Sequence, residues 1–386
     1  MTTPTLPTLP PPIRRFTLTG GGTGGHLYPL IALASELEII ALDRGCPLAL
    51  RFIGCPGGYA SLLEENGMAV RRIVRAQPVP GFSLANLIEI PLFLWSLLQA
   101  LVHLYLFMPD LVFSKGGPGA LAVVLAARFY RIPVYIHDSD SYPGLTSRLS
   151  ARFAERVYLG FSEAIPQFSY ARDFRVVGVP LRRSLFHDVP DAERAKRVLE
   201  FDPSLPLILI LGGSQGARRV NEYILEALPE LLGRYQVLHQ LGRANYASAV
   251  EAAALRLEGL PIRTTDRYRP VDYFENDIKV AYAASDLVIS RAGSIIFEIA
   301  AFARPSILIP LPEANGHQES NARAYALHGA CSVIPDGEVT TERLLAEVLR
   351  IMANDERYAA FSRAATSFAR PEAASVIARD MLDCEA

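Results

Sequence analysis

The chain has 386 residues, of which 50% are hydrophobic and 20% charged, and its formal net charge at pH 7 is -2. This length allows two domains with large cores, and the nearly balanced charge excludes a general attraction to nucleic acid. The four cysteines, Cys46, Cys55, Cys331 and Cys384, are scattered, which fits neither a zinc site nor a disulfide framework and favours a reducing compartment.

Residues 1–12 are rich in Thr and Pro and lack the basic-then-apolar order of a signal peptide, so they predict a disordered tail on a protein whose chemistry faces the cytoplasm. From Arg15 onward, short apolar runs alternate with helical stretches, which predicts an α/β fold with parallel, doubly wound sheets. The predicted strands of the first half are Arg15–Thr19, Leu48–Gly54, Val70–Val74, Asp110–Ser114, Pro133–His137, Arg156–Phe161 and Arg175–Val177. Those of the second half are Leu207–Leu211, Gln236–Gln240, Ile262–Thr265, Leu287–Ser290 and Ser306–Pro310.

The same rhythm divides the chain into two domains. We expect residues 13–180 to form the first and residues 181–367 the second, with the charged stretch 182–196 as the linker between them. A last helix is expected within residues 368–386, packed back on the first domain.

Two glycine-rich turns occur where a predicted strand leads into a helix. The first, Gly20 to His26, reads Gly-Gly-Gly-Thr-Gly-Gly-His, and the second, Gly212 to Ala217, reads Gly-Gly-Ser-Gln-Gly-Ala. Glycine lets backbone N–H groups approach a ligand closely, and the helix N-terminus behind each turn favours negative charge. The pair therefore predicts two facing domains with polyanionic ligands between them, and the second turn, with the hydroxyl of Ser214, should hold a diphosphate.

The first turn formally matches the dinucleotide fingerprint, but the next strand ends Phe52-Ile53-Gly54-Cys55 without a carboxylate for a ribose, which disfavours nicotinamide binding. His26 closes the turn at a helix N-terminus, where the helix dipole favours the neutral imidazole. A neutral His26 could accept a proton from an attacking hydroxyl; a local capping or packing role is the alternative.

Three further polar segments follow predicted strands, at the edge where open α/β sheets bind ligands. His137-Asp138-Ser139-Asp140 is either such a site or a loop with helix-capping acids. Glu298 lies on an otherwise apolar helix after Gly293 and Ser294, and its partner is either a sugar or ribose diol or one of Arg291 and Arg304. The third is the loop 313–319 and the helix after it, where His317, Gln318 and Asn321 could read sugar hydroxyls.

Ile90–Met108 is a stretch of 19 residues without Asp, Glu, Lys or Arg. Its length suits a membrane span, a buried core helix, or a helix whose outer face docks on a bilayer surface. We favour the docked helix, because a span would place the two sides of one sheet on opposite faces of a membrane. Arg71, Arg72 and Arg75, together with Lys115, could then meet anionic headgroups.

Four motifs occur in the order and spacing of a known family: Gly-Gly-Thr-Gly-Gly-His, Gly-Gly-Ser-Gln-Gly-Ala, Arg-x-Gly followed by Glu-Ile-Ala-Ala, and Gln-x-x-Asn-Ala. Over about Arg15 to Leu382 the chain resembles the MurG family of UDP-N-acetylglucosamine:N-acetylmuramyl-(pentapeptide) pyrophosphoryl-undecaprenol N-acetylglucosamine transferases. The resemblance implies two Rossmann-like domains facing across a cleft, the GT-B architecture, at the cytoplasmic face of the cell membrane. It implies an anionic membrane surface, UDP-N-acetylglucosamine and a lipid-linked muramyl-pentapeptide as partners, and no nucleic acid.

The resemblance also implies roles for individual residues. His26 would be the catalytic base or would position the acceptor. The expected UDP-sugar contacts are Thr23, Gly24, Gly25, Asp140, Arg182, Ser214, Gln215, Gly293, Ser294, Ile295, Ile296, Phe297, Glu298, Gln318 and Asn321. Asp140 stands where the family's His-Glu-Gln-Asn motif has its amide, so a carboxylate replaces that contact to the sugar.

The predicted reaction is one displacement, with inversion, at the anomeric carbon of the donor, without a cofactor or an essential metal. The alternatives are a UDP-sugar transferase acting on another membrane lipid, a UDP-sugar epimerase of the same shape, and a sugar-nucleotide-binding membrane scaffold without turnover.

Overall fold

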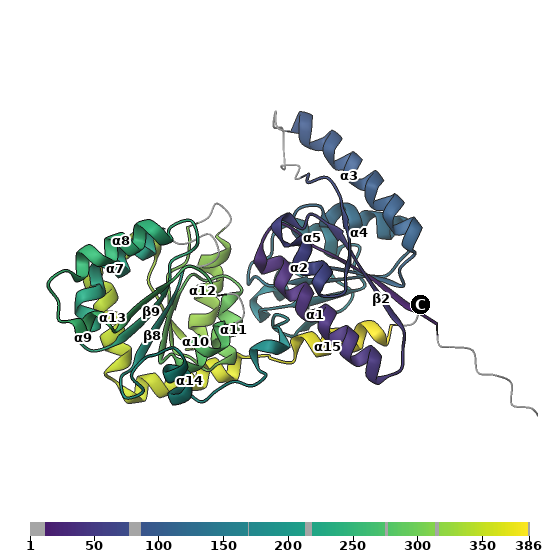
Figure 1. Cartoon of the computed structure of the whole chain (residues 1–386). Helices are drawn as coiled ribbons and strands as arrows, with labels where there is room; N and C mark the ends of the chain where they lie inside the picture. Colours follow the sequence, from purple (N-terminus) through teal and green to yellow (C-terminus); the bar gives the residue numbers. More distant parts are fainter. Residues whose placement is uncertain are drawn as a thin grey trace, which may run out of the picture.

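The computed structural model describes residues 12–76, 86–168, 170–212, 218–274, 277–312 and 316–384. Two α/β domains lie next to each other, each built around a parallel sheet with helices on both faces (Figure 1). The fold class predicted from the alternating pattern is confirmed.

The first domain has a sheet in the order β3-β2-β1-β4-β5-β6-β7 over the described residues. Its strands are β1 (Arg14–Thr19), β2 (Leu48–Gly54), β3 (Ala69–Arg72), β4 (Leu111–Ser114), β5 (Val134–Asp138), β6 (Arg156–Leu159) and β7 (Phe174–Val176). The central strands are buried on both faces, as apolar runs covered by crossover helices should be.

The second domain repeats this plan with the order β10-β9-β8-β11-β12-β13. Its strands are β8 (Leu207–Leu211), β9 (Gln236–Gln240), β10 (Tyr268–Val271), β11 (Leu287–Ser290), β12 (Ser306–Leu308) and β13 (Cys331–Val333). In both sheets the order of the strands reverses beside the first strand of the domain, between β1 and β4 and between β8 and β11. Open α/β sheets bind ligands at this switch point.

Helices connect the strands and cover the sheets. In the first domain they are α1 (Gly24–Asp43), α2 (Ala60–Glu65), α3 (Asn86–Phe107), α4 (Ala120–Phe129) and α5 (Leu145–Ala151). The others are α6 (Ala192–Val198), α7 (Arg218–Leu232), α8 (Tyr246–Leu257), α9 (Ile262–Thr265), α10 (Ile278–Ala284), α11 (Ile295–Ala301), α12 (His317–Leu327), α13 (Thr341–Met352), α14 (Asp355–Phe368) and α15 (Ala373–Leu382).

One predicted strand is wrong: Ile262–Thr265 forms the short helix α9, whose last N–H groups bond back to the carbonyl of Pro261. The strand that pairs with β9 is β10, and it includes Pro270. Proline is tolerated there because β10 is an edge strand. The three-residue strand β13 was not predicted.

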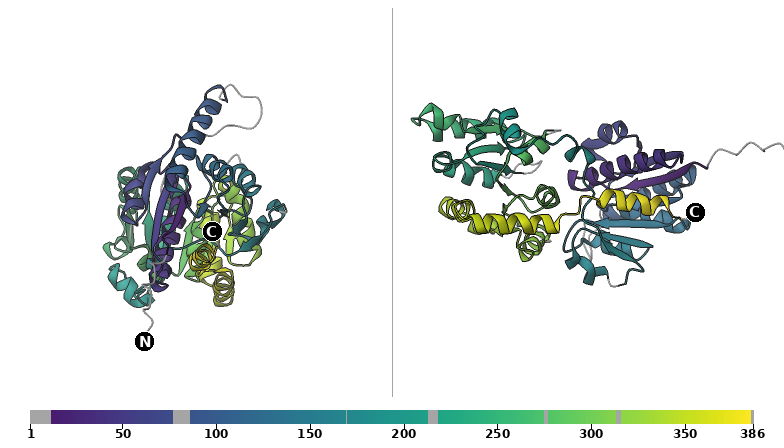
Figure 2. Two further views of the ribbon diagram at one scale, coloured as in Figure 1. Left: turned by 90° about the vertical axis from the view of Figure 1, so that its right-hand side faces the viewer. Right: turned by 90° about the horizontal axis from the view of Figure 1, so that it is seen from below.

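The chain crosses twice between the domains. After α14 it returns to the first domain, where α15 packs along α1 (Figures 1 and 2). Asp380 of α15 accepts the Tyr158 hydroxyl at 2.8 Å and pairs with Arg175 at 2.8 Å. The two segments that cross between the domains are in contact at Gly178 and Arg370. Gly178 has a φ of +81°, and a Cβ there would lie 2.6 Å from Cβ of Arg370, so only glycine fits.

Helix α3 projects away from the first domain (Figures 1 and 2). Near its C-terminal end Ala100 and Leu104 are buried in one core with residues of α4. Among the described residues, two helices are long and apolar enough to cross a membrane, Gly24–Asp43 and Leu87–Phe107. The first is half buried as the core helix α1, whereas only 17% of the apolar window of the second is buried.

Candidate active site

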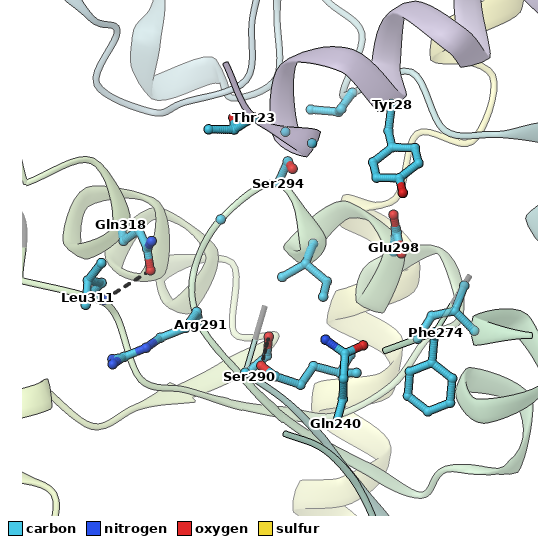
Figure 3. A pocket seen from close by; sticks show the side chains of 18 of the residues that line it. Thr23, Tyr28, Gln240, Phe274, Ser290, Arg291, Ser294, Glu298, Leu311 and Gln318 are labelled. Carbon is cyan, nitrogen blue, oxygen red and sulfur yellow. Dashed lines mark hydrogen bonds between the residues drawn. The ribbon is translucent and has the colours of Figure 1, made fainter. Parts of the chain in front are cut away.

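A cavity of about 760 Å³ lies between the two domains, a size that suits a small organic ligand. The first domain contributes Thr23, Gly24 and Gly25 of the glycine turn, followed by Tyr28. The second contributes residues at the carboxyl ends of β8 and β11 and on α11, including Gly212 and Glu298 (Figure 3). The cavity is therefore placed at the switch points of both sheets.

The first glycine turn, Gly20 to His26, packs against another glycine-rich turn in the same domain, Gly116 to Gly119. Gly117 has a φ of +86°, and a Cβ on it would come within 2.6 Å of the Gly21 oxygen. A Cβ on Gly21 would in turn lie 2.6 Å from the Pro118 oxygen. The two turns thus pack backbone against backbone, which fixes the entry to α1.

His26 lies in the first turn of α1 and is half-buried, and it is not among the lining residues of the cavity. Its Nδ1 is 3.0 Å from Oγ1 of Thr23, which does line the cavity. Burial, and next the positive charge of Lys115, lower the pKa of His26 to about 4, against the opposing effect of Asp140. The neutral imidazole was predicted, but burial and Lys115 account for it rather than the helix dipole alone.

A buried cluster of charges lies beside His26 at the carboxyl ends of β4 and β5. The side chain of Lys115 is 4% exposed and that of Asp138 is 5% exposed. Burial lowers the pKa of Lys115, and the nearby carboxylates of Asp138 and Asp140 raise it. The expectation that Lys115 meets lipid headgroups is therefore wrong, because its ammonium is enclosed with these carboxylates.

Glu298 faces the cavity one turn into α11 and is partly buried (Figure 3). Its Oε2 accepts the hydroxyl of Tyr282 at 3.1 Å, and burial raises its pKa while the charge of Arg182 lowers it. Neither expected arginine is its partner. Arg291 pairs with Asp336 at 2.6 Å, and Arg304 donates to the carbonyl of Ala283 at 3.1 Å.

Arg182 follows the first crossing and lines the cavity. Its guanidinium lies 4.7 Å from the ring centre of Tyr28, and the Tyr28 hydroxyl is 3.2 Å from that of Tyr273 in the other domain. The edge of Tyr59 packs against Tyr28 at 5.9 Å between ring centres. This aromatic group joins the domains at one end of the cavity.

Hydrogen bonds join the domains at a second place, between the loop after β5 and the first turns of α12. Asn321 donates to Asp140 at 2.9 Å and accepts the backbone N–H of Ser141 at 2.8 Å. Ser141 also donates to the Ser320 hydroxyl at 2.7 Å, and His317 is 2.8 Å from the Tyr142 carbonyl. Asn321 is buried there, outside the cavity lining.

The structure brings most of the predicted contacts to one cavity. The expected residues that line it are Thr23, Gly24, Gly25, Arg182, Gly293, Ser294, Ile295, Glu298 and Gln318. His26, Asp140 and Asn321 do not line it. The side chains of Ile296 and Phe297 are in the core, where Phe297 packs on Phe161 with 5.0 Å between ring centres, so the expected contact with the nucleotide is left to their backbone atoms. Ser214 and Gln215 lie outside the described residues.

Several lining residues had no counterpart in the sequence reasoning: Tyr28, Tyr59, Arg219, Tyr273, Phe274, Tyr282 and Asp336. Tyr28 and Arg219 could have been found, because each lies two residues after a predicted glycine turn, on the helix that follows it. The others come from elements remote from the predicted motifs, and no local pattern marks them. Among the described residues, no three His, Cys, Asp or Glu side chains are grouped to hold a metal ion.

Comparisons with known proteins agree over nearly the whole chain. The glycosyltransferase family 28 N-terminal domain matches residues 16–159, and the family 28 C-terminal domain matches residues 207–377. A relative from Syntrophotalea carbinolica is 36% identical and covers 95% of this chain and 97% of its own. Another from Thermodesulfovibrio yellowstonii is 35% identical over 94% and 96% of the two chains. Both are named UDP-N-acetylglucosamine–N-acetylmuramyl-(pentapeptide) pyrophosphoryl-undecaprenol N-acetylglucosamine transferase.

Solved structures share the fold. MurG of Acinetobacter baumannii superposes with a TM-score of 0.73 at 24% identity, covering 96% of this chain and all of that one. UDP-GlcNAc 2-epimerase from Neisseria meningitidis, bound to UDP-GlcNAc, gives a TM-score of 0.69 at 14% identity over 96% of this chain and all of its own. At these identities the likeness shows the two-domain architecture alone.

Proposed function

The chain belongs to glycosyltransferase family 28, among the UDP-N-acetylglucosamine–N-acetylmuramyl-(pentapeptide) pyrophosphoryl-undecaprenol N-acetylglucosamine transferases, and from this premise we propose how its cavity carries out the transfer. The protein moves N-acetylglucosamine from UDP-N-acetylglucosamine to the lipid-linked N-acetylmuramyl-pentapeptide. The observation that carries the proposal is the convergence of two glycine-turn domains and Glu298 on one cavity.

The second domain binds the nucleotide. Glu298, held by Tyr282, accepts the ribose hydroxyls, and Arg182 lies close enough to balance its charge. The diphosphate lies at the end of the cavity lined by Gly212, where α7 directs its N-terminus. Gln318 orients the sugar, because its Oε1 is fixed by the N–H groups of Ala292 at 3.2 Å and Leu311 at 3.0 Å.

The first domain binds the acceptor and supplies the base. With Nδ1–H donating to Thr23, Nε2 of His26 carries the lone pair and takes the proton of the attacking hydroxyl. The hydroxyl oxygen attacks the anomeric carbon from the side opposite the diphosphate, so the configuration inverts. Burial, and next the positive charge of Lys115, lower the pKa of His26 to about 4, so the imidazole is unprotonated at neutral pH.

The direct test is transfer of radiolabelled sugar. Wild-type protein with UDP-N-acetylglucosamine and the lipid-linked muramyl acceptor should form a labelled disaccharide lipid. UDP-glucose and a diacylglycerol acceptor serve as controls for donor and lipid. Transfer to diacylglycerol instead, or release of an epimerised UDP-sugar without acceptor, would overturn the assignment.

We propose further that α3 docks the first domain on the cytoplasmic face of an anionic membrane, the side on which nucleotide sugars are available. Its outward face exposes Leu94, Trp95 and Leu98, at 60%, 54% and 49%. Arg71 and Arg75 are exposed on the segment beside α3, and the backbone N–H of Val74 in that segment donates to Gln99 of α3 at 2.8 Å. Apolar side chains with basic neighbours favour an interfacial helix on anionic lipid.

Trp95 is the only tryptophan in the chain, so its fluorescence reports α3 alone. We expect a blue shift on adding vesicles that contain anionic lipid, weakened by salt and by Leu98→Asp. Leu255→Asp is the matched control, because Leu255 is 73% exposed on α8 in the other domain. Unchanged emission with anionic vesicles would contradict the docking.

A further inference from the structure

One end of the cavity is lined by three arginines and one carboxylate: Arg218, Arg219, Arg291 and Asp336. The side chain of Asp336 is only 4% exposed. Its Oδ1 lies 2.6 Å from Nη1 of Arg291, and its Oδ2 lies 3.0 Å from Nη1 of Arg219. One buried carboxylate therefore holds two guanidinium groups beside the region assigned to the diphosphate.

The two guanidinium groups are held differently. The Arg291 side chain is 12% exposed and also donates to the carbonyl of Ile309 at 3.0 Å, which fixes it. The Arg219 side chain is 55% exposed, and its other contact is the hydroxyl of Tyr223 at 3.2 Å on the same helix. If Arg219 turns away, Asp336 keeps Arg291 and stays paired, and a half-exposed ion pair costs little to break.

Arg218 also lines this end of the cavity, but its side chain is held differently from that of Arg219. Its side chain is 84% exposed and pairs with Glu222 at 3.1 Å, one turn along α7. Within the part of the chain that the structure describes, Glu222 is its ion-pair partner, so it lacks the link to the cavity wall that Asp336 gives Arg219.

We propose that Arg219 is a further catalytic residue, which leaves Asp336 when the donor binds and donates hydrogen bonds to the β-phosphate. This inference rests on the proposed transferase function. In the reaction the bond between the anomeric carbon and the β-phosphate oxygen breaks, and its electron pair stays on that oxygen. The acceptor oxygen forms the new bond and gives its proton to His26. Arg219 neutralises the charge that develops on the departing UDP, which is stabilisation by a preorganised donor.

The test compares Arg219→Gln with Arg256→Gln. Arg256 is a matched control, because its side chain is also 55% exposed and pairs with a glutamate, at 3.8 Å, in the same domain. Arg219→Gln should lower kcat about 10- to 100-fold, the range for loss of a hydrogen bond to a charged group. Calorimetry should show weaker UDP binding and nearly unchanged UMP binding, because UMP has no β-phosphate. A merely structural role would not move this ratio.

The outcomes separate the two proposals. If wild-type protein transfers no N-acetylglucosamine, the proposed function fails, whatever Arg219 does. If wild-type protein is active and Arg219→Gln matches Arg256→Gln in kcat and in the UDP to UMP affinity ratio, the role of Arg219 is refuted. Arg219→Lys should recover part of kcat, because it restores charge without the forked geometry. Equal losses for UDP and UMP would also refute it.

Discussion

Replacing Lys115 by methionine should move the pH profile of the reaction toward neutral pH. His26 has a pKa of about 4, so at pH 5 about 90% of it is unprotonated; at the ordinary value of 6.5 the fraction would be about 3%, a difference of roughly 30-fold. Lys115 is the second cause of the lowered pKa, after burial. Without its charge the pKa should rise from about 4 but stay below 6.5, since the imidazole remains buried.

The assay is kcat/KM from about pH 4 to 8, which reports the pKa of the free enzyme. The wild-type acid limb should appear near pH 4, because the base is lost as pH falls through the pKa of His26. The Lys115→Met limb should lie higher. Lys279→Met is the control, because Lys279 donates to the His187 carbonyl outside the cavity. A wild-type limb near 6.5, or an unmoved limb in folded Lys115→Met protein, would refute the assignment of His26.

Three further predictions concern binding and stability. Glu298→Gln should weaken UDP binding about 10- to 100-fold in calorimetry, because a charged acceptor of the ribose hydroxyls is lost. Tyr282→Phe should weaken it by less, because the Tyr282 hydroxyl only orients Glu298. Unchanged UDP affinity in Glu298→Gln would exclude the ribose role. Gly117→Ala should cost about 1–3 kcal/mol of unfolding free energy, because its φ is +86° and the Cβ has no room, whereas Gly58→Ala, with no atom within 4 Å, should be nearly neutral in the same thermal melts. Burial lowers the pKa of His239 to about 3, so the side chain takes up a proton on unfolding below about pH 6.5. The free energy of unfolding should therefore fall as pH drops from about 6.5 toward 3. His239→Gln should make this pH dependence less steep, and an equal pH dependence would contradict the prediction.

Much of the fold could be predicted because its signals are local. Buried parallel strands appear as continuous apolar runs, and β8 and β11 were found with their observed ends for this reason. The glycine turn of Gly20–His26 was found because glycine is needed where backbone meets backbone, as at Gly21. The β-branched Ile262–Thr265 misled the strand prediction, since Pro261 and the turn after α8 favour a helical turn there.

The partners of the site residues could not be predicted, because they depend on packing between remote segments. The sequence shows that Glu298 needs a partner, but both proposed arginines lie near it in the chain, whereas Tyr282 reaches it from α10. Asp336 follows β13 and gave no signal, although it pairs with Arg219 across more than a hundred residues of chain. Similarly, Phe297 directly precedes the lining residue Glu298 in sequence, yet its position on α11 turns it into the core.

The contact between Asp140 and Asn321 bears on how the donor sugar is read. Both hydrogens of the Asn321 amide are used, by Asp140 at 2.9 Å and by the Ala292 carbonyl at 3.2 Å, and its oxygen accepts the Ser141 N–H. In this arrangement Asn321 is buried outside the cavity lining and has no hydrogen left for a sugar hydroxyl. A carboxylate at position 140 suits this arrangement, because it only accepts, whereas an amide could also present its N–H groups. The same carboxylate raises the pKa of His26, so the contact between the domains and the proposed base of the first domain share one charged group. Any change in this contact would therefore change the electrostatic surroundings of His26.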